Sequence, residues 1–548
     1  MKKKLLVIFI LMLQCIFAQN TISENQKLEA TCKIWGFLKY YHPKVANGSK
    51  NWDEQLFTIL PKIENAQTKE EFSTVLENWI AEQGEIQTYE KVKSDPKIEY
   101  FTKNLDLSWT NDSKVFSKSL SKKLSLIQNN RYQGKQYYVD YESDLLKNEI
   151  LYPDFKWTDK NLRLLAFFRY WNLVEYFFPY KYQMDQKWDI TLQQMIPRFN
   201  NSESETDYNL ALRELTVKLN DRHASFDAMK VHEYLGLKFT PIIFKIIDDK
   251  IIIVDFYDAN LALENDLKFG DVITKIDGKS INEVISEKKQ YVSGSNNASM
   301  LDNFQYVLLN GNADTVSVEL TRDGVTRTKI INRYPLGKIT ISKEKNLKPE
   351  WELLQGNIGY VNIEKLSVSN LPKIMEEFKN TKAIVFDIRG YPKEVLLSLA
   401  EYLNPSEKQY ARQIVPDLTY PGRFYWADMQ KCGKENPDYY KGKVISLVNE
   451  KTFSQSEYLT MVLQTAPNQT IVGSQTAGAD GSNIRFQIIK GFRTSFSGYG
   501  VFYPNKKETQ RIGIVLDIVV KPTILGIQQG KDEVLDRAIL FANGTKVD

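Results

Sequence analysis

This sequence has very little cysteine and histidine, with only 3 residues of each among 548. No cluster of the two has zinc-ligand spacing, so a zinc site is not expected. The apolar run at its N-terminus is too short to span a bilayer comfortably, and no other apolar stretch of about 18 residues occurs, so we expect no integral membrane span. It has no long Lys/Arg run with interleaved aromatic residues, which disfavours nucleic-acid binding. We therefore expect a mechanism that uses no cofactor and no metal.

The chain is long and contains enough apolar residues to form hydrophobic cores. With 42% hydrophobic and 26% charged residues, the chain fits about two to four folded domains. The formal net charge is +4, and Lys2, Lys3 and Lys4 supply three of those charges. The rest of the chain is close to neutral, so charge alone points to no acidic partner.

The N-terminus has the pattern of an export signal. Three lysines precede an apolar run from Leu5 to Leu13, and residues 1–18 together fit a cleavable signal peptide. We expect an exported protein that is periplasmic, surface-associated or secreted. Cys15 would leave with the signal, and whether Cys32 and Cys432 pair in an oxidising compartment stays open.

An internal repeat organises the first part of the chain. The second copy follows the first by 136 positions, so that Trp35 corresponds to Trp171. The apolar spacing is helical, and the shared Tyr-x-x-Pro pattern predicts that one helix ends in each copy. We predict a duplicated helical domain over residues 19–235, with copies at about 27–80 and 163–219. His42 corresponds to Phe178, which favours a packing role for this histidine.

Residues 236–334 change to short β-rich runs. Strands are expected around 242–244, 251–254, 270–276 and 316–320, and Asp277-Gly278 is a strong hairpin signal. The stretch 267–278 resembles the signature of a PDZ domain. That resemblance implies binding of an extended chain end, with backbone amides of the loop holding its carboxylate. The loop residues are Gly236, Leu237, Lys238 and Phe239, and the alternative is a PDZ-like spacer that binds nothing.

Residues 335–548 alternate apolar runs with helical stretches, which is typical of an α/β fold with buried parallel strands. Strands are expected at 359–363, 383–388, 444–448 and 470–473. After the third of these come a turn containing Ser454 and a helix over 458–466. A serine at a strand-to-helix turn lies where unpaired backbone N–H groups stabilise an oxyanion. The simpler interpretation is that Ser454 or Ser456 merely caps the helix.

The segment from Asn449 to Glu457 resembles the nucleophile segment of the tail-specific, or C-terminal processing, serine peptidases of the S41 type. Two further stretches are similar to that family, 386–390 (Phe-Asp-Ile-Arg-Gly) and 513–517 (Gly-Ile-Val-Leu-Asp). The resemblance implies an α/β peptidase core over 335–548 with Ser454 as the nucleophile.

The resemblance also indicates how the serine is activated. Lysine-dependent members have a lysine near the position of Ala479, and here it is absent. A serine hydroxyl needs a base, and residues 218–226 resemble the segment from which tricorn-type members supply a histidine. We therefore expect His223 to be the general base and His232 to be a surface residue.

Three more positions follow from the resemblance. The assisting acidic residue is expected to be Glu508, with Gln510 and Asp480 as alternatives. The backbone amides of Gly390 and Gln455 are expected to bind the oxyanion, although Pro392 and Lys393 replace flexible residues in the loop that follows Gly390.

These expectations combine into one function. The protein is expected to be an exported serine endopeptidase that cleaves unfolded or tail-presented polypeptides through an acyl-enzyme. The alternative is a peptide-binding scaffold whose catalytic site has decayed.

Overall fold

The computed structural model describes residues 21–86, 96–141, 145–340, 348–393 and 397–545. The chain forms two compact units, each assembled from segments far apart in sequence. The helical unit comprises Met1–Leu215, Ile414–Trp426 and Ile484–Gly498. The sheet unit comprises Thr216–Gln413, Ala427–Asn483 and Tyr499–Asp548. The predicted export signal lies outside the described residues.

This division differs from the predicted boundaries in two ways. Residues 216–235 belong to the sheet unit, and two later segments join the helical unit. In one of them, β17 (Phe424–Trp426) pairs with β1 (Tyr100–Phe101). In the other, the carbonyl of Ile488 accepts a hydrogen bond from Arg169 at 2.8 Å. These bonds link residues hundreds of positions apart, and local patterns do not reveal such links.

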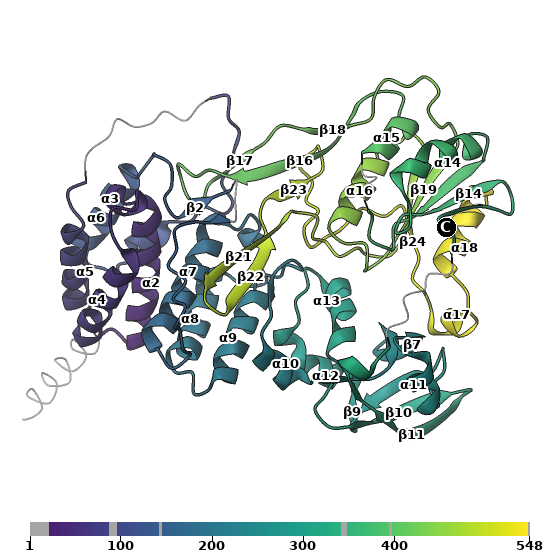
Figure 1. Ribbon diagram of the computed structural model, residues 1–548. Coiled ribbons are helices and arrows are strands. Elements are labelled where there is room, and N and C mark those ends of the chain that lie inside the picture. The colour runs from purple at the N-terminus through teal and green to yellow at the C-terminus, as the bar shows by residue number, and fades with distance from the viewer. Residues whose placement is uncertain (1–20, 87–95, 142–144, 341–347, 394–396, 546–548) are drawn as a thin grey trace, which may run out of the picture. The chain divides into compact units, whose positions relative to one another are not determined.

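Two similar sets of helices form most of the helical unit (Figure 1). The first consists of α2 (Glu24–Tyr41), α4 (Trp52–Asn65) and α5 (Lys69–Glu82), and the second of α7 (Lys160–Phe177), α8 (Trp188–Asn200) and α9 (Glu205–Val217). Short α3 (Pro43–Ala46) follows α2, and α6 (Lys118–Asn129) lies between the sets in sequence. Helices α2 and α7 both end before the proline of the Tyr-x-x-Pro pattern, as predicted, because proline lacks the N–H that would extend the helix.

The same tryptophan contact occurs in both sets. The Trp35 indole N–H donates to the Trp52 carbonyl at 3.1 Å, and that of Trp52 donates back at 2.9 Å. Trp171 and Trp188 exchange the same bonds at 3.2 and 3.0 Å. All four indoles are buried, so each bond satisfies a donor that burial would otherwise leave unpaired. This recurrence supports the predicted duplication, which itself stays a prediction.

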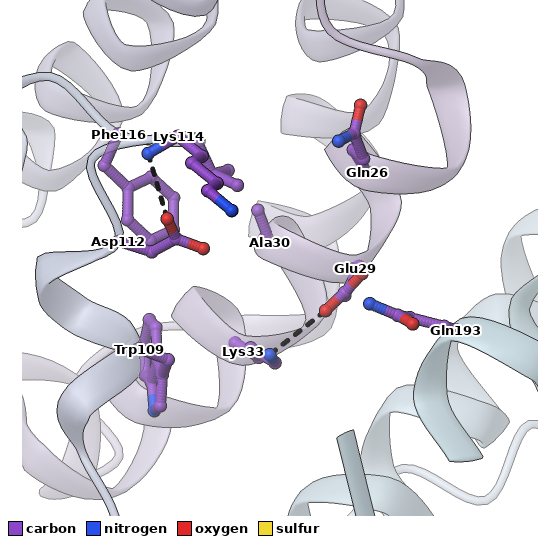
Figure 2. Close-up of a pocket in the computed structure, with 10 residues that line it drawn as sticks. Gln26, Glu29, Ala30, Lys33, Trp109, Asp112, Lys114, Phe116 and Gln193 are labelled. Atoms are coloured by element: carbon purple, nitrogen blue, oxygen red, sulfur yellow. Dashed lines mark hydrogen bonds and ion pairs between the residues drawn. The ribbon is translucent and has the colours of Figure 1, made fainter. Parts of the chain in front are cut away.

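Figure 2 shows a small pocket of the helical unit, with a volume of about 230 Å³. Side chains of α2 form one wall, where Lys33 lies 3.1 Å from Glu29. Trp109 and Phe116 belong to the opposite wall. Lys33 also lies 3.3 Å from Asp189 of α8. The charge on the α2 wall is thus already paired within the protein.

The first part of the sheet unit is an antiparallel sheet with strand order β11-β10-β8-β7-β6. Its strands are β6 (Ile242–Ile247), β7 (Lys250–Phe256), β8 (Val272–Ile276), β10 (Thr315–Arg322) and β11 (Val325–Asn332). The predicted hairpin is confirmed: β8 pairs with β9 (Lys279–Ser280) through Asp277 and Gly278, whose φ angles are 48° and 81°. Strand β6 lies at the edge of this sheet. The PDZ assignment stays a prediction.

The second part is a mostly parallel sheet with strand order β13-β14-β15-β19-β20-β24. The four predicted strands are confirmed as β14 (Ile358–Asn362), β15 (Ala383–Asp387), β19 (Lys443–Val448) and β20 (Gln469–Gly473). They pair in parallel with one another, and β13 (Trp351–Leu354) adds an antiparallel edge while β24 (Ile518–Val519) extends the parallel pairing. Because both faces are covered, these strands are mostly apolar.

Helices cover the two faces of this parallel sheet. On one face, α14 (Leu371–Phe378), α15 (Ser398–Leu403) and α16 (Gln455–Leu463) pack with side chains of β14, β15 and β19 in one apolar core. On the other face, α18 (Glu533–Ala542) packs against the alternate side chains of the same strands. The carboxyl ends of the parallel strands are thereby fixed at one edge, where Ser454 follows β19.

Two questions raised by the sequence have direct answers. Cys32 and Cys432 are both free and buried, so they do not pair. Within the described ranges, no helix has the length and apolarity needed to cross a bilayer.

Candidate active site

Ser454 lies in the sharp turn between β19 and α16, as the sequence predicts. Its backbone has φ 54° and ψ −116°, a conformation that L-residues rarely adopt. Although Ser454 is at the N-cap position of α16, its side chain makes no capping hydrogen bond. The simpler interpretation of Ser454 as a helix cap is therefore wrong. Strain of this kind costs about 1–3 kcal/mol and is typical of residues that are positioned for chemistry.

His223 is in contact with this serine. Its Nε2 lies 3.1 Å from the Ser454 Oγ, which is hydrogen-bonding distance. The imidazole is buried, and its ring centroid lies 4.7 Å from that of Phe453. Both residues belong to the sheet unit, although 231 positions separate them.

The other side of the imidazole faces Asp221. Asp221 Oδ1 lies 3.8 Å from His223 Nδ1 and accepts the backbone N–H of His223 at 3.1 Å. Its side chain is fully buried. The Gln510 side-chain amide donates to the same oxygen at 3.5 Å. A carboxylate at this distance favours the tautomer with the proton on Nδ1, which leaves Nε2 free to accept a proton from the serine.

The three residues predicted to assist the histidine have different surroundings. Gln510 has no charge, and its side-chain amide donates a hydrogen bond to Asp221. Glu508 is half-buried and pairs with Phe502 in an isolated β-bridge, and its assisting role stays a prediction. Asp480 Oδ1 lies 3.0 Å from the Thr509 hydroxyl.

The surroundings of Asp480 disfavour its charged form. Burial raises its pKa well above the ordinary value, and the nearby Glu457 carboxylate raises it further. Both effects favour the neutral carboxyl group over the carboxylate, and the assisting role of Asp480 stays a prediction.

Glu457 links the helix that follows Ser454 to a neighbouring loop. It is three residues after Ser454 and is buried. Its carboxylate accepts the Thr476 hydroxyl at 2.5 Å and the backbone N–H groups of Gly478 and Ala479 at 2.7 and 2.9 Å. Burial raises the pKa of Glu457, whereas these donors favour its charged form. The three hydrogen bonds to Glu457 link the first turn of α16 to the loop that follows β20.

The loop after β15 is tied to α16 from the other side. The Ser456 hydroxyl donates to the Gly390 carbonyl at 3.2 Å, and the Thr452 hydroxyl donates to the Ile388 carbonyl at 2.9 Å. A Cβ on Gly390 would lie 2.7 Å from the Cβ of Glu364, so this close approach requires glycine. The loop predicted to supply one oxyanion donor is thus held against the nucleophile turn.

Gln455 is the first residue of α16. Backbone N–H groups at this end of a helix have no partner within the helix, and the helix dipole favours negative charge there. The roles of Gln455 and Gly390 as oxyanion donors stay predictions.

Hydrogen bonds within the protein engage three of the four backbone amides predicted to hold a substrate carboxylate, those of Gly236, Leu237 and Lys238. The N–H of Gly236 donates to the His232 carbonyl at 2.7 Å, and that of Lys238 donates to Gly311 at 3.0 Å. The N–H of Leu237 donates to the Asn312 side chain at 3.2 Å. Lys238 and Phe239 also form strand β5, which pairs with β12 (Tyr334–Pro335). The amides of Gly236, Leu237 and Lys238 are therefore occupied by the protein itself.

The remaining histidines fit their predicted roles. His232 has 49% of its side chain exposed and lies 2.5 Å from Asp227. His42 is fully buried, and its Nδ1 accepts the Lys44 backbone N–H at 3.3 Å. Burial, with Lys50 and Lys44 nearby, lowers the pKa of His42 to about 4, so it is neutral at pH 7.

Two residues of the site were not predicted from the sequence, Asp221 and Glu457. Asp221 had a local signal, since it is two residues before His223 in the same turn. Glu457 had a weaker one, because an acidic residue in the first turn of a helix is common for reasons of the helix dipole.

A family model and several solved structures are similar to this chain. Residues 357–520 match the model of peptidase family S41. No curated protein is similar to the chain in sequence at a significant level. Among solved structures, mature CPAF is 14% identical with a TM-score of 0.55, and its complex with lactacystin is 15% identical with a TM-score of 0.53. Each comparison covers 70% of this chain and 98% of the other.

The photosystem II D1 C-terminal processing protease is 17% identical over 69% of this chain and 99% of its own, with a TM-score of 0.39. At these identities the structural likeness concerns the fold, and it is the two CPAF structures that carry it.

Proposed function

We propose that this chain is a serine peptidase of family S41, whose model residues 357–520 match, with Ser454 as its nucleophile and His223 as its general base. The observation that carries the proposal is the 3.1 Å contact between Ser454 Oγ and His223 Nε2. It joins a strained residue at a helix N-terminus to a buried imidazole, and capping or packing does not require such a contact.

The first step transfers a proton and forms a covalent bond. As Ser454 Oγ attacks a peptide carbonyl carbon, its proton moves to His223 Nε2, and the carbonyl oxygen becomes an oxyanion. The backbone N–H groups of Gln455 and Gly390 stabilise this oxyanion. His223 then gives the proton to the leaving amine, and the acyl-enzyme remains on Ser454.

The second step reverses these roles with water. His223 Nε2 takes a proton from a water molecule, whose oxygen attacks the ester carbonyl. Collapse of the new tetrahedral intermediate returns the proton to Ser454 Oγ and releases the carboxylate product. In both steps Asp221 lies beside Nδ1 and stabilises the imidazolium ion that forms.

The substrate class follows from the edge of the antiparallel sheet. Strand β6 is at that edge, and a groove of about 430 Å³ runs along it. The groove is lined by both apolar and polar side chains of β6 and α13 (Asn297–Asn303), and also by Ser474 and Gln475, which follow β20. An extended polypeptide adds to an open sheet edge by backbone hydrogen bonds, so unfolded or tail-presented chains are the expected substrates.

We further infer export, because residues 1–18 have the composition of a cleavable signal peptide. N-terminal sequencing of the mature protein from its native host tests this. A mature N-terminus near Gln19 supports export, and an intact Met1 in a cytoplasmic fraction contradicts it.

The function is tested by degradation of casein, an unfolded protein, with the parent and with Ser454→Ala, His223→Ala and His232→Ala. We expect the first two variants to lose at least about 1,000-fold in rate and the surface control His232→Ala to retain the parent rate. A serine-directed fluorophosphonate probe followed by peptide mapping is expected to label Ser454. Equal cleavage by the parent and Ser454→Ala, or tight peptide binding by the parent without turnover, would overturn the proposal.

A further inference from the structure

A cavity of about 440 Å³ lies at the carboxyl ends of β15 and β19, wholly within the sheet unit. Gly390, Asn449 and Lys451 line it, so it adjoins both the loop predicted to bind the oxyanion and the segment that leads to Ser454. Its other charged lining residues are Lys245, Lys348, Arg389, Lys531, Glu364, Asp387, Asp532 and Glu533. The proposed mechanism assigns no role to this cavity.

Most of these charged side chains already form salt bridges or hydrogen bonds within the protein. Arg389 donates to Asp387 and to Asp532, with distances of 2.6 to 2.9 Å. Lys348 lies 3.0 Å from Asp532. The pKa of Asp387 is lowered in spite of burial, because Arg389 donates hydrogen bonds to its carboxylate. This part of the wall is a closed network with little capacity to bind an ion.

The remaining committed charges lie at the edges of the cavity. Glu533 accepts the Thr523 backbone N–H at 2.5 Å and the Thr523 hydroxyl at 2.9 Å. Lys245 lies 2.5 Å from Glu450, whose pKa is lowered despite burial. Lys451 is close enough to Glu450 to contribute to that shift, although the ion pair of Glu450 is with Lys245.

Two lysines of the cavity wall form no salt bridge with a described residue. Across the described parts of the chain, neither Lys451 nor Lys531 has a carboxylate within 4.0 Å of its ammonium group, and both residues are exposed. Lys451 is three residues before Ser454, and Lys531 directly precedes the N-cap of α18. Glu364, the remaining carboxylate of the wall, also has an interaction within the protein. The lining charges without an ion pair are therefore the two lysines, and Lys451 belongs to the segment that leads to Ser454.

We propose that this cavity is a substrate subsite for a carboxylate group, held by the ammonium groups of Lys451 and Lys531. The inference rests on the proposed peptidase function and names a preferred chemistry for its substrates. The carboxylate is either an Asp or Glu side chain or the C-terminus of the substrate. Such a subsite would hold a substrate carboxylate although the Gly236, Leu237 and Lys238 amides are occupied by the protein itself.

The test compares matched peptides in the full-length parent protein. One pair differs only by Glu or Gln at a single position and has an amidated C-terminus. The other pair has a neutral sequence and ends in a free carboxylate or an amide. We expect kcat/KM to favour the carboxylate member of at least one pair by about tenfold, and the pair that shows the preference identifies the source. The preference should fall as NaCl rises, because these lysines are exposed to solvent.

The lysines are then tested with Lys451→Gln, Lys531→Gln and the double variant, and with Lys122→Gln in the helical unit as a matched exposed control. We expect the double variant to reduce the carboxylate preference to about twofold or less and the control to keep the parent preference. A preference that is absent in the parent, or that is unchanged in the double variant, overturns the inference.

A binding measurement separates this failure from failure of the proposed function. Fluorescence anisotropy of the same labelled peptides with Ser454→Ala, with and without the two lysine substitutions, needs no turnover. Loss of the preference in binding with the substitutions supports the subsite even if the parent hydrolyses nothing. Equal binding of both members of each pair overturns it even if the parent is an active peptidase.

Discussion

Asp221 Oδ1 accepts the backbone N–H of His223 at 3.1 Å and lies 3.8 Å from the Nδ1 of the same residue. One carboxylate thus fixes the turn that carries the imidazole and also faces its ring. The side-chain amide of Gln510 donates to the same oxygen. This relationship makes Asp221 a positioning residue for the proposed general base.

We expect Asp221→Asn to lower kcat by about 100-fold or more, because an amide at this position stabilises neither the Nδ1–H tautomer nor the imidazolium ion. KM should change much less, since Asp221 is not in the proposed path of the substrate. The measurement is the pH profile of kcat with a fluorogenic peptide. The matched control is Asp227→Asn, which removes the carboxylate beside the surface residue His232 and should retain the parent rate. A parent-like kcat in Asp221→Asn would contradict the assignment.

Glu457 is expected to matter for stability as much as for activity. Glu457→Gln keeps the shape of the side chain but replaces one acceptor oxygen with an NH₂ group that faces buried donors from Thr476, Gly478 and Ala479. We expect a loss of about 2–4 kcal/mol in the free energy of unfolding. Urea denaturation followed by circular dichroism measures it, and the exposed Glu435→Gln should differ from the parent by less than about 0.5 kcal/mol.

The crossing of α2 and α7 depends on a glycine. A Cβ added to Gly36 would lie 1.8 Å from Oδ1 of Asn172, whose amide donates to the Cys32 carbonyl at 3.0 Å. We expect Gly36→Ala to destabilise the protein by about 1–3 kcal/mol. The double variant with Asn172→Ala should recover part of that loss, which a thermodynamic cycle would show as coupling.

The control for this crossing is Gly337→Ala, because a Cβ at Gly337 meets no atom within 4 Å. Strictly additive effects of the two substitutions at Gly36 and Asn172 would show that the contact between them is not the cause.

The buried His42 is expected to make the free energy of unfolding depend on pH. Its pKa is about 4 in the folded protein, compared with an ordinary value near 6.5, because burial disfavours the charged form. Between these two pH values the unfolded chain binds a proton that the folded chain does not, so stability falls as the pH drops from about 6.5 to about 4. The contribution is about 3 kcal/mol.

We expect His42→Phe, which introduces the residue found at the corresponding position 178, to flatten that part of the stability curve. The measurement is the free energy of unfolding in urea from pH 4 to pH 7. The loss of the helix-capping bond to Lys44 should cost about 1 kcal/mol at all pH values. An unchanged pH dependence would show that another group is responsible.

The local patterns of the sequence determined much of the sheet unit. Continuous apolar runs predicted β14, β15, β19 and β20, because strands covered on both faces have no polar side. The Asp277-Gly278 hairpin was predictable for an equally local reason, since its residues must adopt positive φ. The turn at Ser454 was also predictable, because a strand, a turn and a helix follow one another there directly.

His223 was predictable only through resemblance to a family. The sequence limited the choice to three histidines, and periodicity alone does not show which of them lies near residue 454. Asp221 was within the same resembling segment, but its role depends on an oxygen that lies between a ring nitrogen and the amide of Gln510.

What the sequence by itself determined is the set of buried strands, the hairpin and the turn at Ser454, because each depends on residues within about ten positions. Only the tertiary structure decided that the Gly236, Leu237 and Lys238 amides are occupied, that Glu457 ties α16 to the loop after β20, and that residues 414–426 and 484–498 join the helical unit. The physical reason is the same in each case. A buried donor or acceptor must find a partner, and in these places the partner comes from a part of the chain that no local pattern identifies.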